Sequence, residues 1–160
     1  MNRLAAIATV GALVLAPSVA FGQTAANGSR GLVWGPQVSL GFENSDVGLG
    51  VRLHHSLSSV LGGEPISGQA EANWFPDADW FDLNYDVVYN FRATTLAPYA
   101  GGGLNFSIVS GGGNTSSDFH LNAVGGLIFK PMGKITPLLQ LRYIFVGGGD
   151  EFIGTFGVMF

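Results

Sequence analysis

The chain has 160 residues, of which 47% are apolar and only 11% are charged, and its formal net charge is −4. So few charges cannot coat a water-soluble domain, in which roughly a quarter of the residues are charged. The negative net charge and the lack of clustered lysine and arginine argue against a nucleic-acid partner. The absence of cysteine excludes disulfides, thiolate metal sites and cysteine nucleophiles. The length fits one domain.

Residues 1–22 are predicted to be a secretory signal peptide. Arg3 supplies positive charge, residues 4–15 are apolar, and Ala20-Phe21-Gly22 forms a small-x-small cleavage site, with cleavage after Ala20 as the alternative. A short N-terminal anchor helix is the other interpretation, but the apolar run is shorter than the roughly 20 residues that span a bilayer. Residues 23–31 are predicted to be a flexible leader and residues 32–160 a single β-barrel.

The rest of the chain contains no run that approaches 18 consecutive apolar residues, so we expect no transmembrane helix. Apolar and polar residues instead alternate in segments of about ten residues, the length of a tilted strand that crosses a membrane. In chain order these eight segments are 34–43, 47–57, 66–75, 81–91, 98–108, 119–129, 135–145 and 151–160. Turn-forming residues separate them, which predicts an up-and-down antiparallel barrel with both ends on one side.

One face of each segment is almost purely apolar, whereas the charged residues of the segments share the other face. Those charged residues are Glu43, Arg52, Glu71, Asp82, Asp86, Arg142 and Glu151. A soluble barrel would show a charged exterior to water, so we place the polar face in the lumen and the apolar face against lipid. The glycines at 101, 102 and 103 blur this pattern, and residues 98–103 fit either register.

Aromatic residues gather at both ends once the segments are laid antiparallel, as expected where aromatic rings meet the two membrane interfaces. The belt at the end with the termini comprises Trp34, Tyr89, Phe91, Tyr99, Phe129 and Phe160. The opposite belt comprises Phe42, Trp74, Trp80, Phe81, Phe106, Phe119, Phe145 and Phe152.

From residue 34 onward the chain resembles small outer-membrane β-barrels of the OmpA/OmpX type. Its last segment, with Phe152, Phe156, Val158 and Phe160, is similar to the terminal strand of those families, although Gly154 departs from the pattern. Residues 98–104 also resemble a segment common in these barrels. The resemblance implies an all-β, eight-stranded transmembrane barrel in a Gram-negative outer membrane. It also implies that Phe156, Val158 and Phe160 form the signal read by the barrel-assembly machinery.

The interior of an eight-stranded barrel is just wide enough for side chains to fill, and charges inside it must be paired. Counting from the hairpins places Arg52 beside Glu71 and Glu71 near Asp86, so we expect Arg52 to bridge carboxylates. Arg142 is expected among His120, Asn122 and Thr155. We therefore predict a structural or surface-interaction protein with a filled lumen, and a narrow channel for ions or small solutes as the alternative.

The two ends differ in charge. The presumed outer loops hold Asp46, Asp77, Asp79, Asp118 and Asp150, whereas the inner turns hold Arg92, Lys130 and Lys134. These acidic residues either are simply solvated or contact divalent ions that bridge lipopolysaccharide phosphates. The expected partners are outer-membrane lipids, lipopolysaccharide and the barrel-assembly machinery. Among the outer loops, residues 109–118 have the longest reach.

A catalytic role is the third alternative, because His54 and Ser56 share a strand face and their spacing resembles the His-x-Ser of lipid A deacylases. That face is assigned to the lumen, whereas such an enzyme needs its nucleophile toward lipid. The glycine triplets lack the Lys-Ser/Thr of a phosphate-binding loop, and the three histidines have no metal-binding spacing. We therefore expect no enzymatic activity, cofactor or metal.

Overall fold

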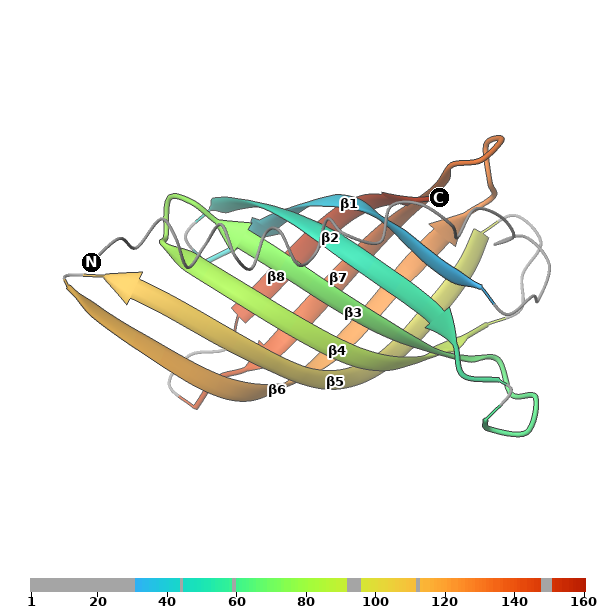
Figure 1. Ribbon diagram of the computed structural model, residues 1–160, viewed down its shortest axis with the longest axis horizontal. Helices are drawn as coiled ribbons and strands as arrows, with labels where there is room; N and C mark the ends of the chain where they lie inside the picture. The colour runs from blue at the N-terminus through green and yellow to red at the C-terminus, as the bar shows by residue number, and fades with distance from the viewer. Residues whose placement is uncertain (1–30, 44, 59, 92–95, 112, 148–150) are drawn as a thin grey trace.

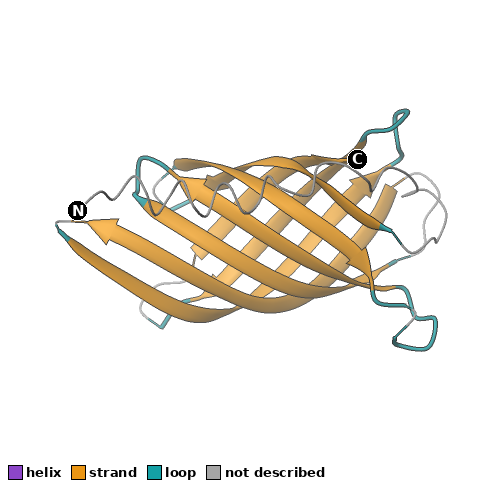
Figure 2. Cartoon of the chain, viewed as in Figure 1, coloured by secondary structure: helices purple, strands orange, loops and turns teal. Residues whose placement is uncertain are grey.

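The computed structural model describes residues 31–43, 45–58, 60–91, 96–111, 113–147 and 151–160. These residues form one closed antiparallel barrel in which each strand pairs with its neighbours in sequence and the last strand pairs with the first (Figures 1 and 2). The strands are β1 (Leu32–Gly41), β2 (Asp46–Ser56), β3 (Ile66–Phe75), β4 (Trp80–Asn90), β5 (Leu96–Gly111), β6 (Asn114–Phe129), β7 (Thr136–Phe145) and β8 (Glu151–Met159).

The predicted eight-stranded up-and-down barrel is thus confirmed. Within the described ranges, no helix is long and apolar enough to cross a membrane. The predicted signal peptide at 1–22 and nearly all of the predicted leader at 23–31 lie outside the described residues. We call the end where β1 begins and β8 ends the terminal end, and the opposite end the distal end.

Hydrophobic alternation explains the strands, because each side chain takes the face that its parity dictates. Val38 is 47% exposed on the exterior of β1, whereas its sequence neighbours Gln37 and Ser39 face the lumen and are 4% and 1% exposed. Leu49 on the exterior of β2 is 58% exposed. A contiguous apolar exterior of this kind is unfavourable in water and favourable in hydrocarbon. The placement of the polar face in the lumen is therefore confirmed.

Two residues assigned to the aromatic belts face the lumen instead. Leu104 points outward, so the unbroken alternation of β5 sends Tyr99 inward, where it is 2% exposed. This settles the register of residues 98–103. Trp80 immediately precedes Phe81 in β4 and therefore points inward, where its ring stacks on Phe75 with centroids 4.3 Å apart. The remaining aromatic residues of both predicted belts lie on the exterior.

The hairpin of β5 and β6 is longer than the rest of the wall. β4 pairs with β5 only as far as Val109, and β7 pairs with β6 only from Leu121. Beyond these pairs, residues 110–111 and 113–120 form an arm whose ladder pairs all lie within the hairpin and which projects past the distal end (Figure 1). At its base, the N–H of Ser110 donates to the carbonyl oxygen of Asp79 at 3.0 Å. The prediction of a loop at 109–118 was wrong, because Ser110 and Thr115 continue the ladder and their hydroxyls lie 3.3 Å apart.

The barrel closes along a short seam between β1 and β8. The ladder there runs only from the pair Gln37 and Gly157 to the pair Gly41 and Ile153. Gly35 lies next to this ladder, and a Cβ on it would fall 1.6 Å from the carbonyl oxygen of Val158. Only a residue without a side chain lets β8 approach β1 this closely.

Candidate functional site: the lumen and its distal mouth

The centre of the lumen is organised around Glu71 of β3. Nη2 of Arg52 and Nη2 of Arg142 each lie 2.9 Å from its Oε1 atom. Nε2 of Gln140 donates to the same oxygen at 3.0 Å, and Nε2 of Gln37 donates to Oε2 at 3.2 Å. All of these side chains are buried, so one carboxylate holds two guanidinium groups, one from the adjacent strand β2 and one from β7 across the lumen.

The residue that bridges carboxylates is Arg142 and not Arg52. Nη2 of Arg142 pairs with both Glu71 and Asp86, whereas Arg52 pairs with Glu71 and donates from Nη1 to the hydroxyl of Tyr99 at 3.2 Å. Counting from hairpins relates only adjacent strands, so it predicts Arg52 beside Glu71 but cannot show which residue of β7 reaches across the lumen. The two strands that carry Glu71 and Asp86 face β7 only once the barrel has closed.

Asn122 and Thr155 lie diagonally beside Arg142 on the neighbouring strands, but its ion pairs are with the carboxylates of β3 and β4 across the lumen. The hydroxyl of Thr155 lies 3.0 Å from that of Ser39. Nδ2 of Asn122 donates to Asn84, and His120 lines a cavity at the distal end. These three residues therefore take part in other contacts of the same lumen.

A layer of amides lies on the distal side of this charge network. Nδ2 of Asn105 donates to Oδ1 of Asn84 at 2.9 Å, and Nδ2 of Asn84 donates to Oδ2 of Asp82 at 3.2 Å. Gln37 connects the layer to Glu71, because its Nε2 atom also donates to Asn73 at 2.7 Å. These amides were not singled out from the sequence, although each occupies the polar parity of its strand.

Apolar side chains close the lumen at both ends of the polar region. The distal cluster comprises Phe75, Trp80, Ile144 and Ile153. At the terminal end lie two clusters, one of Val33, Leu138 and Met159 and the other of Val88, Tyr99 and Val124, with Ile128 packed against both. The sequence prediction missed these layers because they interrupt the polar face with apolar residues only near the strand ends.

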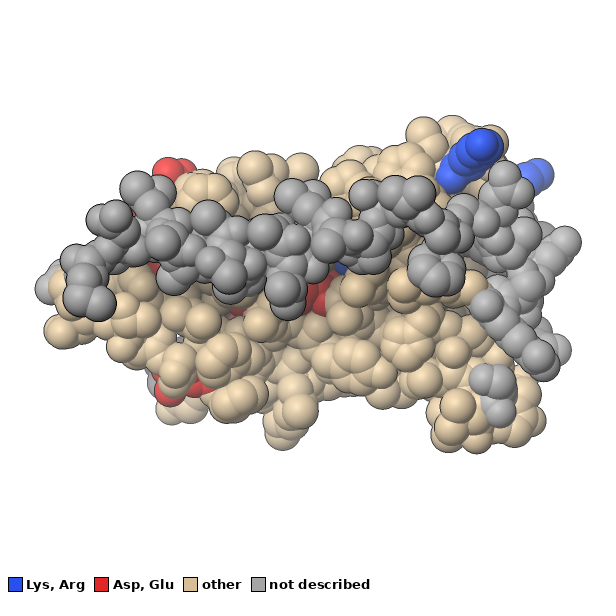
Figure 3. Space-filling model, in the orientation of Figure 1, with Lys and Arg blue, Asp and Glu red and all other residues tan. Residues whose placement is uncertain are grey.

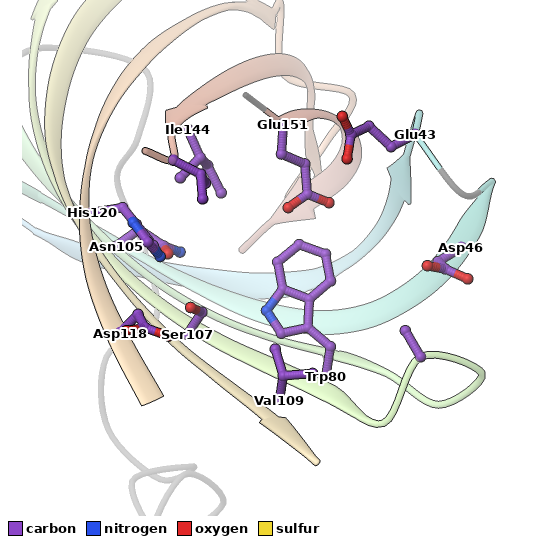
Figure 4. A pocket seen from close by; sticks show the side chains of 12 residues that line it. Glu43, Asp46, Trp80, Asn105, Ser107, Val109, Asp118, His120, Ile144 and Glu151 are labelled. Atoms are coloured by element: carbon purple, nitrogen blue, oxygen red, sulfur yellow. The ribbon is translucent and has the colours of Figure 1, made fainter. Parts of the chain in front are cut away.

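A cavity of about 570 Å³ opens above the distal apolar cluster, and we call it the mouth cavity (Figure 4). Its acidic lining residues are Glu43, Asp46, Asp118 and Glu151, and no lysine or arginine is among the residues that line it. No group of three or more His, Asp or Glu residues in the described part of the chain is arranged to hold a metal ion.

Charge is divided between the two ends of the barrel. Figure 3 shows basic groups at one end and acidic groups toward the other. Lys130 and Lys134 follow β6 at the terminal end, whereas Asp77 and Asp79 lie in the turn between β3 and β4 at the distal end. Arg92 and Asp150, which belong to the same predicted division, lie outside the described residues.

Of the predicted pair of His54 and Ser56, the serine is hydrogen-bonded to a neighbouring serine. Ser56 Oγ lies 2.6 Å from Ser58 Oγ, and the backbone N–H of Ser58 donates to it. His55 Nε2 instead lies 3.3 Å from the Tyr85 hydroxyl on the exterior, where the two side chains approach each other over Gly68. The residues of the predicted assembly signal lie on the outer face of β8 and just after it: Phe156 and Phe160 are exposed and Val158 is half-buried.

Tyr99 offers a direct test of how much this network stabilises the barrel. Its hydroxyl accepts from Arg52 and donates to Gln140 Oε1 at 2.8 Å, so Tyr99→Phe leaves two buried polar groups without this partner. We expect the free energy of unfolding to fall by about 1–3 kcal/mol. Urea unfolding in lipid vesicles measures it. Tyr89→Phe is the matched control on the exterior, and an equal loss in both variants would contradict the network's role.

The fold is similar to that of solved outer-membrane and designed transmembrane barrels. The N-terminal β-barrel domain of Pseudomonas aeruginosa OprF matches with a TM-score of 0.65 and 15% identity, over 81% of this chain and 95% of that one. A de novo designed transmembrane β-barrel matches with a TM-score of 0.60 and 10% identity, over 82% and 96%. The outer-membrane enzyme PagL matches with a TM-score of 0.51 and 14% identity, over 79% and 96%.

No protein-family model and no curated protein sequence matches the chain. At these identities the solved structures show a shared fold, that of the small eight-stranded outer-membrane barrels. These matches show the fold alone, because one fold hosts unrelated functions.

Proposed function

We propose that the protein is an integral outer-membrane barrel with a structural or surface-interaction role and a lumen closed by its own side chains. The observation that carries this proposal is the layered interior. Glu71 holds two arginines at its centre, and apolar clusters lie at both ends. Buried charges paired in this way fill a barrel of this size and leave no wide aqueous path.

Outer-membrane residence is supported by the apolar exterior and by the barrel's likeness to outer-membrane proteins. In this placement the terminal end faces the periplasm and the distal end faces outward. The partners are then membrane lipids and lipopolysaccharide, and the barrel-assembly machinery would read Phe156, Val158 and Phe160. The exposure of Phe156 and Phe160 on the outer face supports that role, because another protein can contact side chains that the lumen does not bury.

Heat-modifiable electrophoresis of outer-membrane fractions tests this proposal. The folded barrel is expected to resist the detergent of the gel without boiling and to migrate as a compact species, then to shift to the mobility of the unfolded chain after boiling. The physical reason is that every strand is paired on both sides, so the wall opens only cooperatively. Recovery of the chain as a freely soluble periplasmic protein would refute the proposal.

A narrow channel is the second candidate, favoured by a row of lumen acceptors. Oδ1 atoms of Asp82, Asp86, Asn105 and Asn122 are buried without a hydrogen-bond partner among the described residues. The distal cluster and the paired arginines oppose a continuous path. Planar lipid-bilayer recording of purified protein is therefore expected to show no stable single-channel steps. Reproducible unitary steps from the folded form would favour the channel over the filled barrel.

A lipid-modifying enzyme stays the third candidate, and we propose that the protein has no such activity. The hydrogen bonding of Ser56 to Ser58 supports this, since a nucleophilic serine needs a base within reach. A Ser56→Ala change that abolished a measured lipid deacylation would revive the enzyme.

A further inference from the structure

The mouth cavity combines negative charge with unsatisfied polar groups, and this combination points to a ligand. Its volume of about 570 Å³ falls in the ordinary range for small-molecule sites. Strands from around the barrel contribute to it, with Asp118 and His120 from β6 and Glu151 from β8. An acidic surface alone is not a binding site, but the base of this cavity adds buried polar groups.

Two buried side chains at the base are directed into the cavity and have polar atoms without partners. Trp80 is 7% exposed and Asn105 is 0% exposed, and both line the cavity (Figure 4). Within the described ranges, neither the indole N–H of Trp80 nor Oδ1 of Asn105 has a hydrogen-bond partner. A buried polar group without a partner is unfavourable by the full cost of its desolvation, so a molecule that enters here gains by bonding to it.

The arrangement of the carboxylates selects the kind of ligand. Figure 4 shows Glu43 and Glu151 on one wall, with the Glu151 carboxylate pointing toward the Trp80 indole, and Asp118 on the opposite wall. The acidic groups do not converge on one point, and no described group of three is arranged to hold a metal ion. A ligand that satisfies both walls must therefore carry at least two positive groups that are held apart.

Trp80 also offers an aromatic surface to such a ligand. Phe75 stacks on one face of the indole, with ring planes 14° apart, and the indole, with its unpartnered N–H, also lines the cavity. Ammonium groups are attracted to the face of tryptophan, and this attraction grows when the site is partly desolvated. The same groups donate hydrogen bonds to carboxylates and to an amide oxygen such as Oδ1 of Asn105.

We propose that the mouth cavity binds a small organic polycation with two or more ammonium groups. Asp118 holds one ammonium group and Glu151 with Glu43 holds another, while Trp80 and Asn105 contact the ligand between them. Two sources supply this chemistry, a linear polyamine and an amino sugar. The hydroxyl groups of an amino sugar would in addition accept from the Trp80 N–H. This inference deepens the surface-interaction role proposed above by assigning a ligand class to the distal end.

Isothermal titration calorimetry of the purified protein tests it, in nonionic detergent free of lipopolysaccharide so that no anionic lipid binds the probe. The probes are spermidine, kanamycin, butylamine and Ca²⁺. Saturable binding of spermidine or kanamycin, tighter than that of butylamine and Ca²⁺, is expected. Tighter binding of spermidine would identify a linear polyamine as the ligand, and tighter binding of kanamycin would identify an amino sugar. Absence of saturable binding by both, or stronger binding of Ca²⁺, would overturn the proposal.

Charge-neutral variants locate the site. Asp118→Asn and Glu151→Gln are each expected to weaken binding by about tenfold, the usual size for loss of one charge-assisted hydrogen bond. Asp77→Asn is the matched control, because Asp77 lies at the same end but does not line the cavity. Equal weakening in the control would show general electrostatic attraction and would contradict a built site.

Heat-modifiable electrophoresis of each variant separates loss of binding from loss of fold. Asp118 lies on the arm, where β6 pairs with β5 but not with β7. Asp118→Asn is therefore expected to fold and can test the site even if Glu151→Gln does not fold. A protein that shows the heat shift but binds neither polycation refutes the ligand and leaves the proposed barrel standing. A protein without the shift refutes the barrel itself.

Discussion

Replacing Glu71 by glutamine is expected to lower the free energy of unfolding by about 3–5 kcal/mol, the usual loss when one partner of a buried ion pair is removed. The variant keeps the size of the side chain but removes the charge that faces Arg52 and Arg142. Arg142 retains Asp86, whereas Arg52 keeps only neutral partners, Gln37 and Tyr99. Urea unfolding in lipid vesicles, followed by tryptophan fluorescence, measures the loss.

Two further variants decide whether the unpaired cation is the cause. Glu64→Gln changes an exposed carboxylate in the turn before β3 and should leave stability within about 0.5 kcal/mol of the parent. The double variant Arg52→Met, Glu71→Gln should recover part of the loss of Glu71→Gln, because it removes the cation that lacks its carboxylate. A double variant that is no more stable than Glu71→Gln alone would show that the unpaired cation does not account for the effect.

Gly35→Ala is expected to prevent or severely weaken closure of the barrel. The new Cβ would fall 1.6 Å from the carbonyl oxygen of Val158, and a backbone atom cannot move aside as a flexible side chain can. We expect a loss of about 3 kcal/mol or more, the upper range for overpacking. The measurement is the fraction of chain that reaches the heat-modifiable form after dilution from urea into lipid vesicles.

Gly147→Ala is the control for this prediction. A Cβ at Gly147 meets no atom within 4 Å, so its substitution introduces a methyl group without overlap. This variant should fold as the parent does. Normal folding of Gly35→Ala would show that the seam tolerates a wider spacing than the structure gives it, and the strict requirement for glycine would then be wrong.

The fold was predictable because strand alternation is a local property. In β2, Leu49 on one parity and Arg52 on the other decide which face meets lipid, and no long-range information is needed for that decision. Tyr99 was misplaced because the glycines that follow it carry no apolar signal, and the register became readable only from Leu104 onward. The sequence did not predict the paired arm, because its serine and threonine residues show no apolar alternation. They nevertheless pair across the hairpin as apolar residues do.

Only the contacts between adjacent strands of the site could be predicted from the sequence. Arg52 lies opposite Glu71 because β2 and β3 form one hairpin, and hairpin geometry follows from the turn. The pairing of Arg142 with Glu71 depends on the diameter of the closed barrel and on the length of the guanidinium side chain. The sequence likewise could not predict that the N–H of Trp80 lacks a hydrogen-bond partner, because that depends on all the groups packed around it in the fold.

In the projecting hairpin of β5 and β6, the length of the strands is independent of the pairing that sets the register of the barrel wall. Past Val109 on one side and Leu121 on the other, its residues have no ladder partner except each other. Strand registers and the circumference of the cylinder therefore do not depend on how many residues lie between 110 and 120. Evolution or an engineer can lengthen, shorten or replace this segment, and the hydrocarbon-spanning part would keep its geometry.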